Sequence, residues 1–230
     1  GLVGSEMCIR DRECIVSFKT VPQMFQHVVS EKPSLKTFYT KTENGWEGIE
    51  LADLQVMVED FANGLKNLGI NDNDKVAIIG ANSRKWAISD YAIAHIRAVS
   101  VPVYPTLIPT QSQYVVEHSE SKIAIVQDEV QLDKVYPLIN DANSNLNTII
   151  IMDDEYNGWK DNVIKYSDVF NMQDTQHDIR AISATVEEND LLTLIYTSGT
   201  TGNPKGVMLS HSNICNNLLS IDSTIKAAME

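Results

Sequence analysis

The segment from Tyr196 to Gly206, YTSGTTGNPKG, has the composition of a loop that holds phosphate groups. Its eleven residues include three glycines, four short hydroxyl side chains and one lysine. Glycine permits positive φ angles and lets the backbone approach a ligand closely, and successive backbone N–H groups in such a turn form a concave anion site. The hydroxyls add hydrogen-bond donors and the lysine adds a mobile charge. Because each hydrogen bond to a charged group contributes about 1.5–3 kcal/mol, three or four would retain a polyphosphate firmly.

The predicted phosphate contacts come from the hydroxyl residues, two of the glycines and the lysine: Thr197, Ser198, Gly199, Thr200, Thr201, Gly202 and Lys205. The pattern differs from the Walker loop, in which Gly-Lys-Ser/Thr opens a helix, because a strand-like run, 206–209, follows Lys205. An apolar run of strand length, 191–196, precedes the loop. The loop is therefore predicted to join two strands. The alternative is a Gly/Ser/Thr-rich hairpin that binds no ligand.

Residues 197–206 resemble the phosphate-binding signature of the adenylate-forming enzymes, a superfamily that includes acyl-CoA synthetases, peptide-synthetase adenylation domains and beetle luciferases. Flanking segments narrow the resemblance to bacterial long-chain fatty acid–CoA ligases; these are LSHSNI at 209–214 with Asn217, VPVYPT at 101–106 and NSRKW at 82–86. The resemblance extends over residues 18–230. It implies an α/β fold in which largely parallel sheets are flanked by helices.

The resemblance also implies a reaction with two steps. A fatty acid carboxylate attacks the α-phosphorus of ATP, with Mg²⁺ present, to give an acyl-adenylate and pyrophosphate, and the thiol of coenzyme A then displaces AMP. Residues 198–202 would surround the β- and γ-phosphates, Lys205 would neutralise them, and Thr200 or Thr201 are candidates to assist Mg²⁺. Positioning and charge neutralisation are the main tasks of a protein in such chemistry.

Two other functions stay open. A fatty acyl-AMP ligase, or an adenylation domain that loads a carrier protein, would share the loop, although peptide synthetases usually lack the VPVYPT flank. Alternatively, the chain is a polyphosphate-binding module without catalysis. The acyl chain length and the acyl acceptor are not readable from these residues, and neither is the oligomeric state.

By the same resemblance, the catalytic lysine, the interdomain hinge and the ribose- and metal-binding acids all follow the phosphate loop. They are expected beyond Glu230, so residues 17–230 are predicted to be the N-terminal part of an AMP-binding domain and to be inactive alone. Residues 1–16, GLVGSEMCIRDRECIV, match nothing in the family and resemble translated adaptor DNA. They are predicted to be a leader foreign to the fold, since no apolar stretch of signal-peptide length is present.

The composition predicts a cytoplasmic α/β protein. Hydrophobic residues make up 43% of the chain, and 18 Lys+Arg stand against 31 Asp+Glu, for a formal net charge of -13. This charge argues against nucleic acid as a partner, and no apolar run approaches the length of a membrane span. The predicted partners are small molecules (fatty acid, ATP and coenzyme A), with peripheral membrane association of the parent protein left open. Cys8, Cys14 and Cys215 lack metal-ligand spacing.

The elements that must position the loop alternate between helix and strand. Apolar residues recur at helical spacing from Leu51 to Leu68. Further on, the pattern predicts strands at 74–80, 99–103, 122–126, 148–151 and 191–196, and helices at 84–98, 111–120, 129–140 and from 212 onward. Strands separated by helices imply parallel pairing. Residues 153–190 carry a weaker pattern and are predicted to be a surface excursion.

Several single residues invite a functional interpretation. His211 follows the loop and is a candidate for the nucleotide or acyl pocket, although a lone histidine at a strand end usually has a structural hydrogen bond. Trp86 and Tyr91 fit a core better than a ligand stack. His118 has no partner at metal or triad spacing. Arg97 stands where long-chain members carry a small residue, which puts the local helix packing in question.

Overall fold

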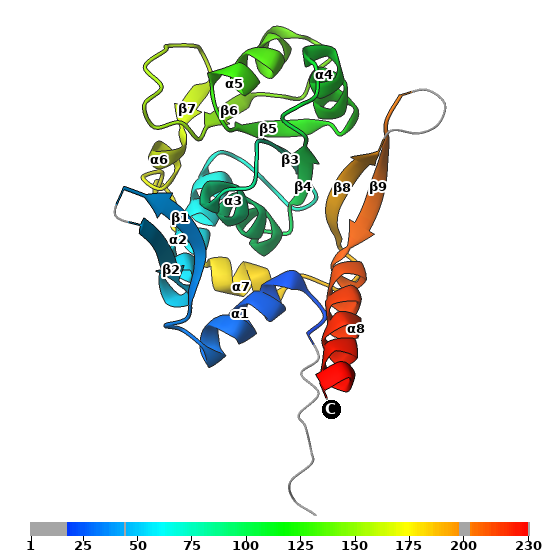
Figure 1. The fold of residues 1–230 in the computed structure, drawn as a ribbon. Coiled ribbons are helices and arrows are strands. Elements are labelled where there is room, and N and C mark those ends of the chain that lie inside the picture. The colour runs from blue at the N-terminus through cyan, green and yellow to red at the C-terminus, as the bar shows by residue number, and fades with distance from the viewer. Residues whose placement is uncertain (1–17, 44, 198–202, 230) are drawn as a thin grey trace, which may run out of the picture.

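The computed structural model describes residues 18–43, 45–197 and 203–229, and a seven-stranded sheet lies at its centre (Figure 1). The strand order is β7-β6-β5-β3-β4-β8-β9. The strands are β3 (Lys75–Ile79), β4 (Val99–Val103), β5 (Ser121–Val126), β6 (Thr148–Ile151), β7 (Val163–Lys165), β8 (Leu191–Thr197) and β9 (Lys205–Ser210). All neighbouring strands pair in parallel except β8 and β9, which are antiparallel. The predicted class, a largely parallel sheet flanked by helices, is confirmed.

Helices cover both faces of this sheet. They are α1 (Val21–Glu31), α2 (Leu51–Asn67), α3 (Arg84–His95), α4 (Pro109–His118), α5 (Glu129–Val135), α6 (Tyr166–Val169), α7 (Ile179–Ala184) and α8 (His211–Met229), with a 3₁₀ turn at Tyr136–Asn140. Buried residues of α2 and α3 belong to one apolar cluster, and those of α4 and α5 belong to another. Within the part of the chain that the structure describes, no helix is both long and apolar enough to cross a bilayer.

Each central strand divides its side chains between these two clusters. In β3, Val76 and Ile78 join the α2/α3 cluster, whereas Ala77 and Ile79 join the α4/α5 cluster. The division follows from the two-residue period of a strand. A parallel strand buried on both faces must be apolar throughout, which is why these strands appear in the sequence as short continuous apolar runs.

The boundaries differ from the sequence prediction where local chemistry ends a helix early. The predicted helix 84–98 stops at His95, and Arg97 has a φ of 56°. The predicted helix 129–140 changes to a 3₁₀ turn from Tyr136 onward, where Pro137 lacks the N–H that an α-helix needs. The strand predicted at 99–103 is β4 without change.

The expectation that residues 153–190 form a surface excursion is wrong in part. This stretch supplies β7, which extends the sheet beside β6, together with α6 and α7. Tyr166 and Val169 of α6 are buried in the α2/α3 cluster, and the Tyr166 ring stacks on Phe61 at 4.4 Å. These elements are too short to show a clear period in the sequence, so only the tertiary packing reveals them.

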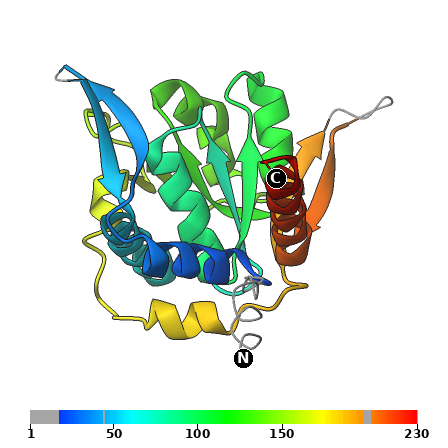
Figure 2. The same ribbon diagram turned by 60° about the horizontal axis from the view of Figure 1, so that its bottom comes forward.

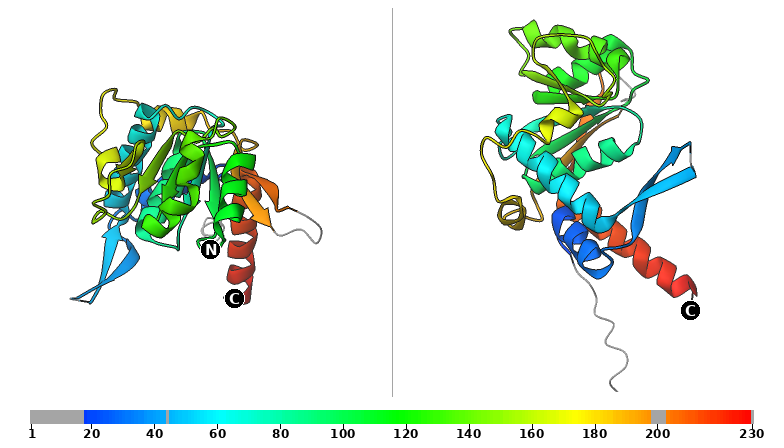
Figure 3. Two further views of the ribbon diagram at one scale, coloured as in Figure 1. Left: turned by 90° about the horizontal axis from the view of Figure 1, so that it is seen from above. Right: turned by 90° about the vertical axis from the view of Figure 1, so that its left-hand side faces the viewer.

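Two N-terminal elements were not predicted. Helix α1 begins after Thr20, whose hydroxyl accepts a hydrogen bond from the Gln23 N–H, and it lies beside α7 (Figure 2). Strands β1 (Lys36–Thr42) and β2 (Gly45–Glu50) form a separate antiparallel hairpin that projects from the body (Figure 3, right). The predicted leader, residues 1–16, lies outside the described residues.

Arg97 does not disturb the packing of α3. Its guanidinium lies 3.0 Å from the Asp190 carboxylate and 3.5 Å from that of Asp72. Burial alone would raise the pKa of Asp190, but the Glu187 N–H and Arg97 outweigh burial and lower it. Arg97 therefore ties the end of α3 to the segment that enters β8.

Candidate phosphate-binding site

The candidate loop is carried by the β8–β9 hairpin. The two strands pair in antiparallel register from Leu191 with Ser210 to Thr197 with Lys205, which is the last pair before the turn. The structure therefore brings Thr197 and Lys205 opposite each other at the entrance to the loop. Ser198, Gly199, Thr200, Thr201 and Gly202 lie outside the described residues, so their predicted contacts stay predictions.

Strand β8 fixes the direction of this hairpin. It runs parallel to β4, with Thr193 opposite Ser100, and the Thr193 hydroxyl donates to the Ser100 carbonyl at 3.0 Å. The carboxyl end of β8 therefore lies at the same edge of the sheet as those of the other parallel strands. Ligands of open α/β sheets bind outside this edge, and the loop begins there.

Lys205 is available to an anionic ligand. Its side chain is exposed, and it forms no ion pair with the residues that the structure describes. A lysine ammonium without a protein partner fits the requirement for a mobile cation next to phosphate. No group of histidines, cysteines and acids suited to hold a metal ion occurs among residues 18–43, 45–197 and 203–229.

Two residues that the sequence prediction missed contact the base of the loop from α4. The Tyr114 hydroxyl donates to the Pro204 carbonyl at 3.2 Å, and His118 Nδ1 lies 2.8 Å from the Tyr196 hydroxyl. Burial, followed by the nearby Tyr114, raises the pKa of Tyr196. His118 was considered only as a metal or triad residue, and its spacing of four residues from Tyr114 was the signal that could have paired them on one helical face.

His211 lies at the other end of β9. Since β9 separates it from Lys205 by six residue steps, the two are about 20 Å apart. The ring is buried, and Nδ1 accepts a hydrogen bond from the Val21 N–H at 3.2 Å. Burial lowers the pKa of His211 to about 4, Asp190 opposes this shift and His95 adds to it. Its Nε2 atom has no hydrogen-bond partner among the described residues. The pocket role of His211 stays a prediction.

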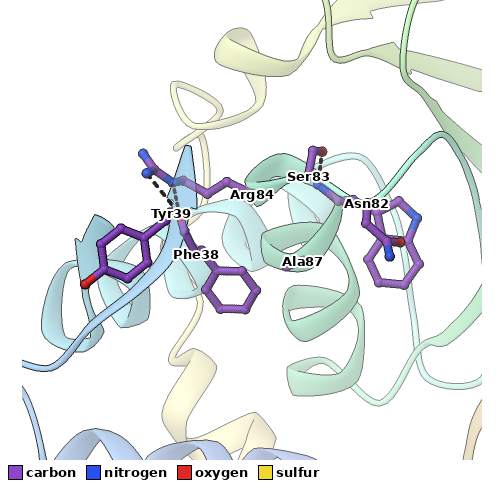
Figure 4. Close-up of a pocket in the computed structure, with 7 residues that line it drawn as sticks. Phe38, Tyr39, Asn82, Ser83, Arg84 and Ala87 are labelled. Carbon is purple, nitrogen blue, oxygen red and sulfur yellow. Dashed lines mark hydrogen bonds between the residues drawn. The ribbon is translucent and has the colours of Figure 1, made fainter. Parts of the chain in front are cut away.

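A cleft of about 530 Å³ lies elsewhere, between the β1–β2 hairpin and the start of α3 (Figure 4). Two of its polar side chains, those of Arg84 and Ser83, are hydrogen-bonded within the protein. Arg84 donates to the carbonyls of Phe38 and Glu47 at distances of 2.9–3.3 Å, and the Ser83 hydroxyl caps α3 by accepting from the Trp86 N–H. The cleft shares no lining residue with the loop or its α4 contacts. It is therefore separate from the candidate phosphate site.

Comparison with known proteins gives a consistent result. A family model described as AMP-binding enzyme matches residues 25–229. A long-chain-fatty-acid–CoA ligase of Xenopus laevis is 31% identical over 199 residues, which cover 85% of this chain and 26% of that protein. A ligase of the same description from Rattus norvegicus is 29% identical over 197 residues, covering 85% of this chain and 27% of that protein. The chain thus spans about a quarter of the length of these relatives.

Solved structures share the fold. The long-chain-fatty-acid-CoA ligase FadD1 of Archaeoglobus fulgidus superimposes with a TM-score of 0.69 at 20% identity, covering 90% of this chain and 40% of that one. The anthranilate CoA ligase AuaEII, solved in complex with anthranoyl-AMP, has a TM-score of 0.70 at 20% identity, covering 84% of this chain and 35% of that one.

Proposed function

The chain belongs to the AMP-binding enzyme family, and from this membership we propose that it is the N-terminal part of an ATP-dependent long-chain fatty acid–CoA ligase. The observation that carries the proposal is the pairing of Thr197 with Lys205 at the entrance to the loop. That pairing places a lysine with no described ion-pair partner beside the glycine- and hydroxyl-rich segment. Relatives with this activity in their names support the choice of substrate class.

In the proposed reaction, the fatty acid carboxylate attacks the α-phosphorus of ATP and pyrophosphate leaves. The acyl-adenylate then reacts with the thiol of coenzyme A, the acyl–oxygen bond to AMP breaks, and a thioester forms. The AuaEII structure, which holds anthranoyl-AMP, supports an AMP-forming first step. Mg²⁺ would reduce the charge repulsion between phosphate and nucleophile.

The residues of this chain would serve the first step. Thr197 and residues 198–202 would donate hydrogen bonds to the β- and γ-phosphates, and Thr200 or Thr201 would assist Mg²⁺. Lys205 would stabilise the charge that grows on pyrophosphate as it leaves. An interaction of this kind, stronger in the transition state than before it, raises the rate of the chemical step.

The 230-residue chain is proposed to make no acyl-CoA alone. The family resemblance places the catalytic lysine and the ribose- and metal-binding acids after the phosphate loop, and the chain covers only 26% of the Xenopus laevis relative. The cytoplasmic location, the assignment of residues 1–16 as a foreign leader and the assignment of 17–230 to an AMP-binding domain stay predictions.

Pyrophosphate exchange tests this function. The full-length protein, expressed from its complete reading frame, is incubated with ATP, Mg²⁺ and labelled pyrophosphate, and palmitate or each amino acid is added separately. Exchange that depends on palmitate, followed by palmitoyl-CoA formation when coenzyme A is added, is the expected result. Exchange supported only by an amino acid would assign the protein to the carrier-loading class. Palmitate-dependent exchange without thioester formation would indicate a fatty acyl-AMP ligase.

A further inference from the structure

We propose that helix α4 positions the phosphate loop through Tyr114 and His118, a role that rests on the proposed function of the loop. The two residues lie one helical turn apart, so both face the β8–β9 hairpin. Each contacts a different strand end: Tyr114 reaches Pro204, just before β9, and His118 reaches Tyr196, near the end of β8. We call Tyr114, His118, Tyr196 and Pro204 the clamp, because their contacts hold both ends of the loop.

The rings of the clamp pack as well as hydrogen-bond. The Tyr114 and His118 rings lie 5.2 Å apart, and the His118 ring meets the Tyr196 ring edge-on at 5.7 Å and 90°. Such edge-to-face contacts are favourable beyond simple burial of apolar surface. The clamp is therefore a continuous row of three rings from the helix to the strand.

Gly206 makes room for this arrangement. It pairs with Tyr196 across the hairpin, and a Cβ atom at this position would lie 3.2 Å from the Tyr196 ring. That separation is below ordinary van der Waals contact. A glycine at the end of the signature thus has a packing reason, separate from any contact with phosphate: it lets the Tyr196 ring lie across β9.

Helix α4 can act as a fixed reference for the loop because it is held to the body of the protein. Val115 and Val116 are buried in the α4/α5 cluster, and Gln113 donates to the Lys134 carbonyl at 2.7 Å. The hairpin, by contrast, has its outer strand β9 at the edge of the sheet. The clamp therefore transfers the rigidity of the core to the ends of a loop on an edge hairpin.

Phosphoryl chemistry depends on position, so a small displacement of donors lowers the rate. One neutral hydrogen bond contributes about 2- to 12-fold in an equilibrium. We expect Tyr114→Phe and Tyr196→Phe in the full-length enzyme each to lower kcat/KM for ATP by about that factor. The KM for palmitate should stay unchanged, and the melting temperature should fall only slightly, because each substitution removes one hydrogen bond and keeps the ring. Tyr136→Phe is the matched control: Lys160 lies over that ring, and none of the described hydrogen bonds or ring pairs joins Tyr136 to the clamp.

A double-mutant cycle identifies the partners. Removing both partners of one hydrogen bond costs no more than removing one of them. In a Tyr196→Phe background, His118→Ala should therefore lower kcat/KM little further, apart from the effect of losing the His118 ring contact. Tyr114→Phe breaks a different hydrogen bond, so its fold-loss in kcat/KM should multiply with that of Tyr196→Phe in the double variant. His118→Gln should lower kcat/KM less than His118→Ala does, because glutamine restores a polar atom. Losses that appear equally in the Tyr136→Phe control, or only as a lower melting temperature, would overturn the proposal.

Amide hydrogen exchange of the 230-residue chain tests the clamp without relying on activity. The amides of Thr197 and of residues 205–207 should exchange about 2- to 12-fold faster in Tyr114→Phe and Tyr196→Phe. If the wild-type enzyme shows no palmitate-dependent pyrophosphate exchange, but these amides exchange hydrogen faster in the two variants, the proposed function fails while the clamp stands. Unchanged amide exchange in both variants would refute the clamp, whatever the enzyme does.

Discussion

The centre of the sheet and the β8–β9 hairpin differ in how their side chains are covered. Ile78 of β3 and Ile125 of β5 are fully buried in the α2/α3 cluster. In β9, Val207 is 44% exposed and Met208 is 68% exposed. Both regions are strands of one sheet, yet the first is a packed interior and the second is an edge with one neighbour.

The two regions differ in role: the buried strands stabilise the fold, and the hairpin carries the candidate phosphate loop. Buried strands contribute the apolar burial that offsets conformational entropy. The hairpin has fewer packing constraints than the buried strands, because its outer strand β9 has only one neighbouring strand. The most informative chemical motif therefore lies on the less covered part of the fold, and α4 compensates by contacting the ends of the loop.

The largest expected effect is a loss of stability caused by a substitution in the buried interior. Leu54 of α2 is fully buried, and Leu54→Ala should lower the free energy of unfolding of the chain by about 2–5 kcal/mol, because it leaves a cavity. Val56, on the same helix and 54% exposed, is the matched control, and Val56→Ala should stay within about 0.5 kcal/mol. Urea unfolding followed by circular dichroism measures both. Equal losses would mean that α2 is not packed as described.

The next effect concerns the end of the hairpin that is remote from the loop, where His211 Nδ1 accepts a hydrogen bond from the Val21 N–H of α1. Its pKa of about 4 lies below the ordinary value of 6.5. Between these values the unfolded chain binds a proton that the folded chain does not, so stability is present above pH 6.5 and falls as the pH drops toward 4. The loss is at most about 3 kcal/mol.

His211→Asn isolates this contribution, because it keeps an acceptor for Val21 but does not titrate. Urea unfolding at several values between pH 7 and pH 4 should show a smaller loss of stability in the variant than in the wild type. Identical slopes would show that His211 is protonated as easily in the folded chain as in the unfolded chain.

The third effect is on the exposed side. Lys205→Ala in the full-length enzyme should lower the efficiency of adenylation by roughly 10- to 150-fold, the equivalent of losing one charged contact of about 1.5–3 kcal/mol. The rate constant of the first half-reaction should carry most of this loss. Since Lys205 is exposed, the melting temperature should hardly change. Thr200→Ala and Thr201→Ala should show smaller losses. Wild-type adenylation rates in all three variants would show that this loop takes no part in the reaction.

The smallest effect is expected from the outer strand of the hairpin. Met208→Ser in the 230-residue chain should change the free energy of unfolding by no more than about 0.5 kcal/mol, because the side chain is mostly exposed. Thermal unfolding of the variant beside the wild type measures this. A loss above about 2 kcal/mol would show that β9 is packed, and the contrast between the two regions would disappear.

The elements that could be predicted are those with a long or pure apolar pattern. The central strands and α2 follow directly from apolar runs and helical spacing. Helix α1, the β1–β2 hairpin and the elements of residues 153–190 were missed or misassigned, because short segments obtain their conformation from packing partners far away in the chain. Tyr166 illustrates this: its place against Phe61 depends on a contact across more than a hundred residues.

By itself, the sequence predicted the chemistry of the loop, from the glycines, hydroxyls and lysine of residues 197–206. It also determined the fold class, because strand and helix periods are local. Only the tertiary structure decided which residues hold the loop, that His211 lies at the far end of β9, and that Arg97 pairs with Asp190. Each of these depends on a distance between residues remote in the chain, which no local pattern encodes.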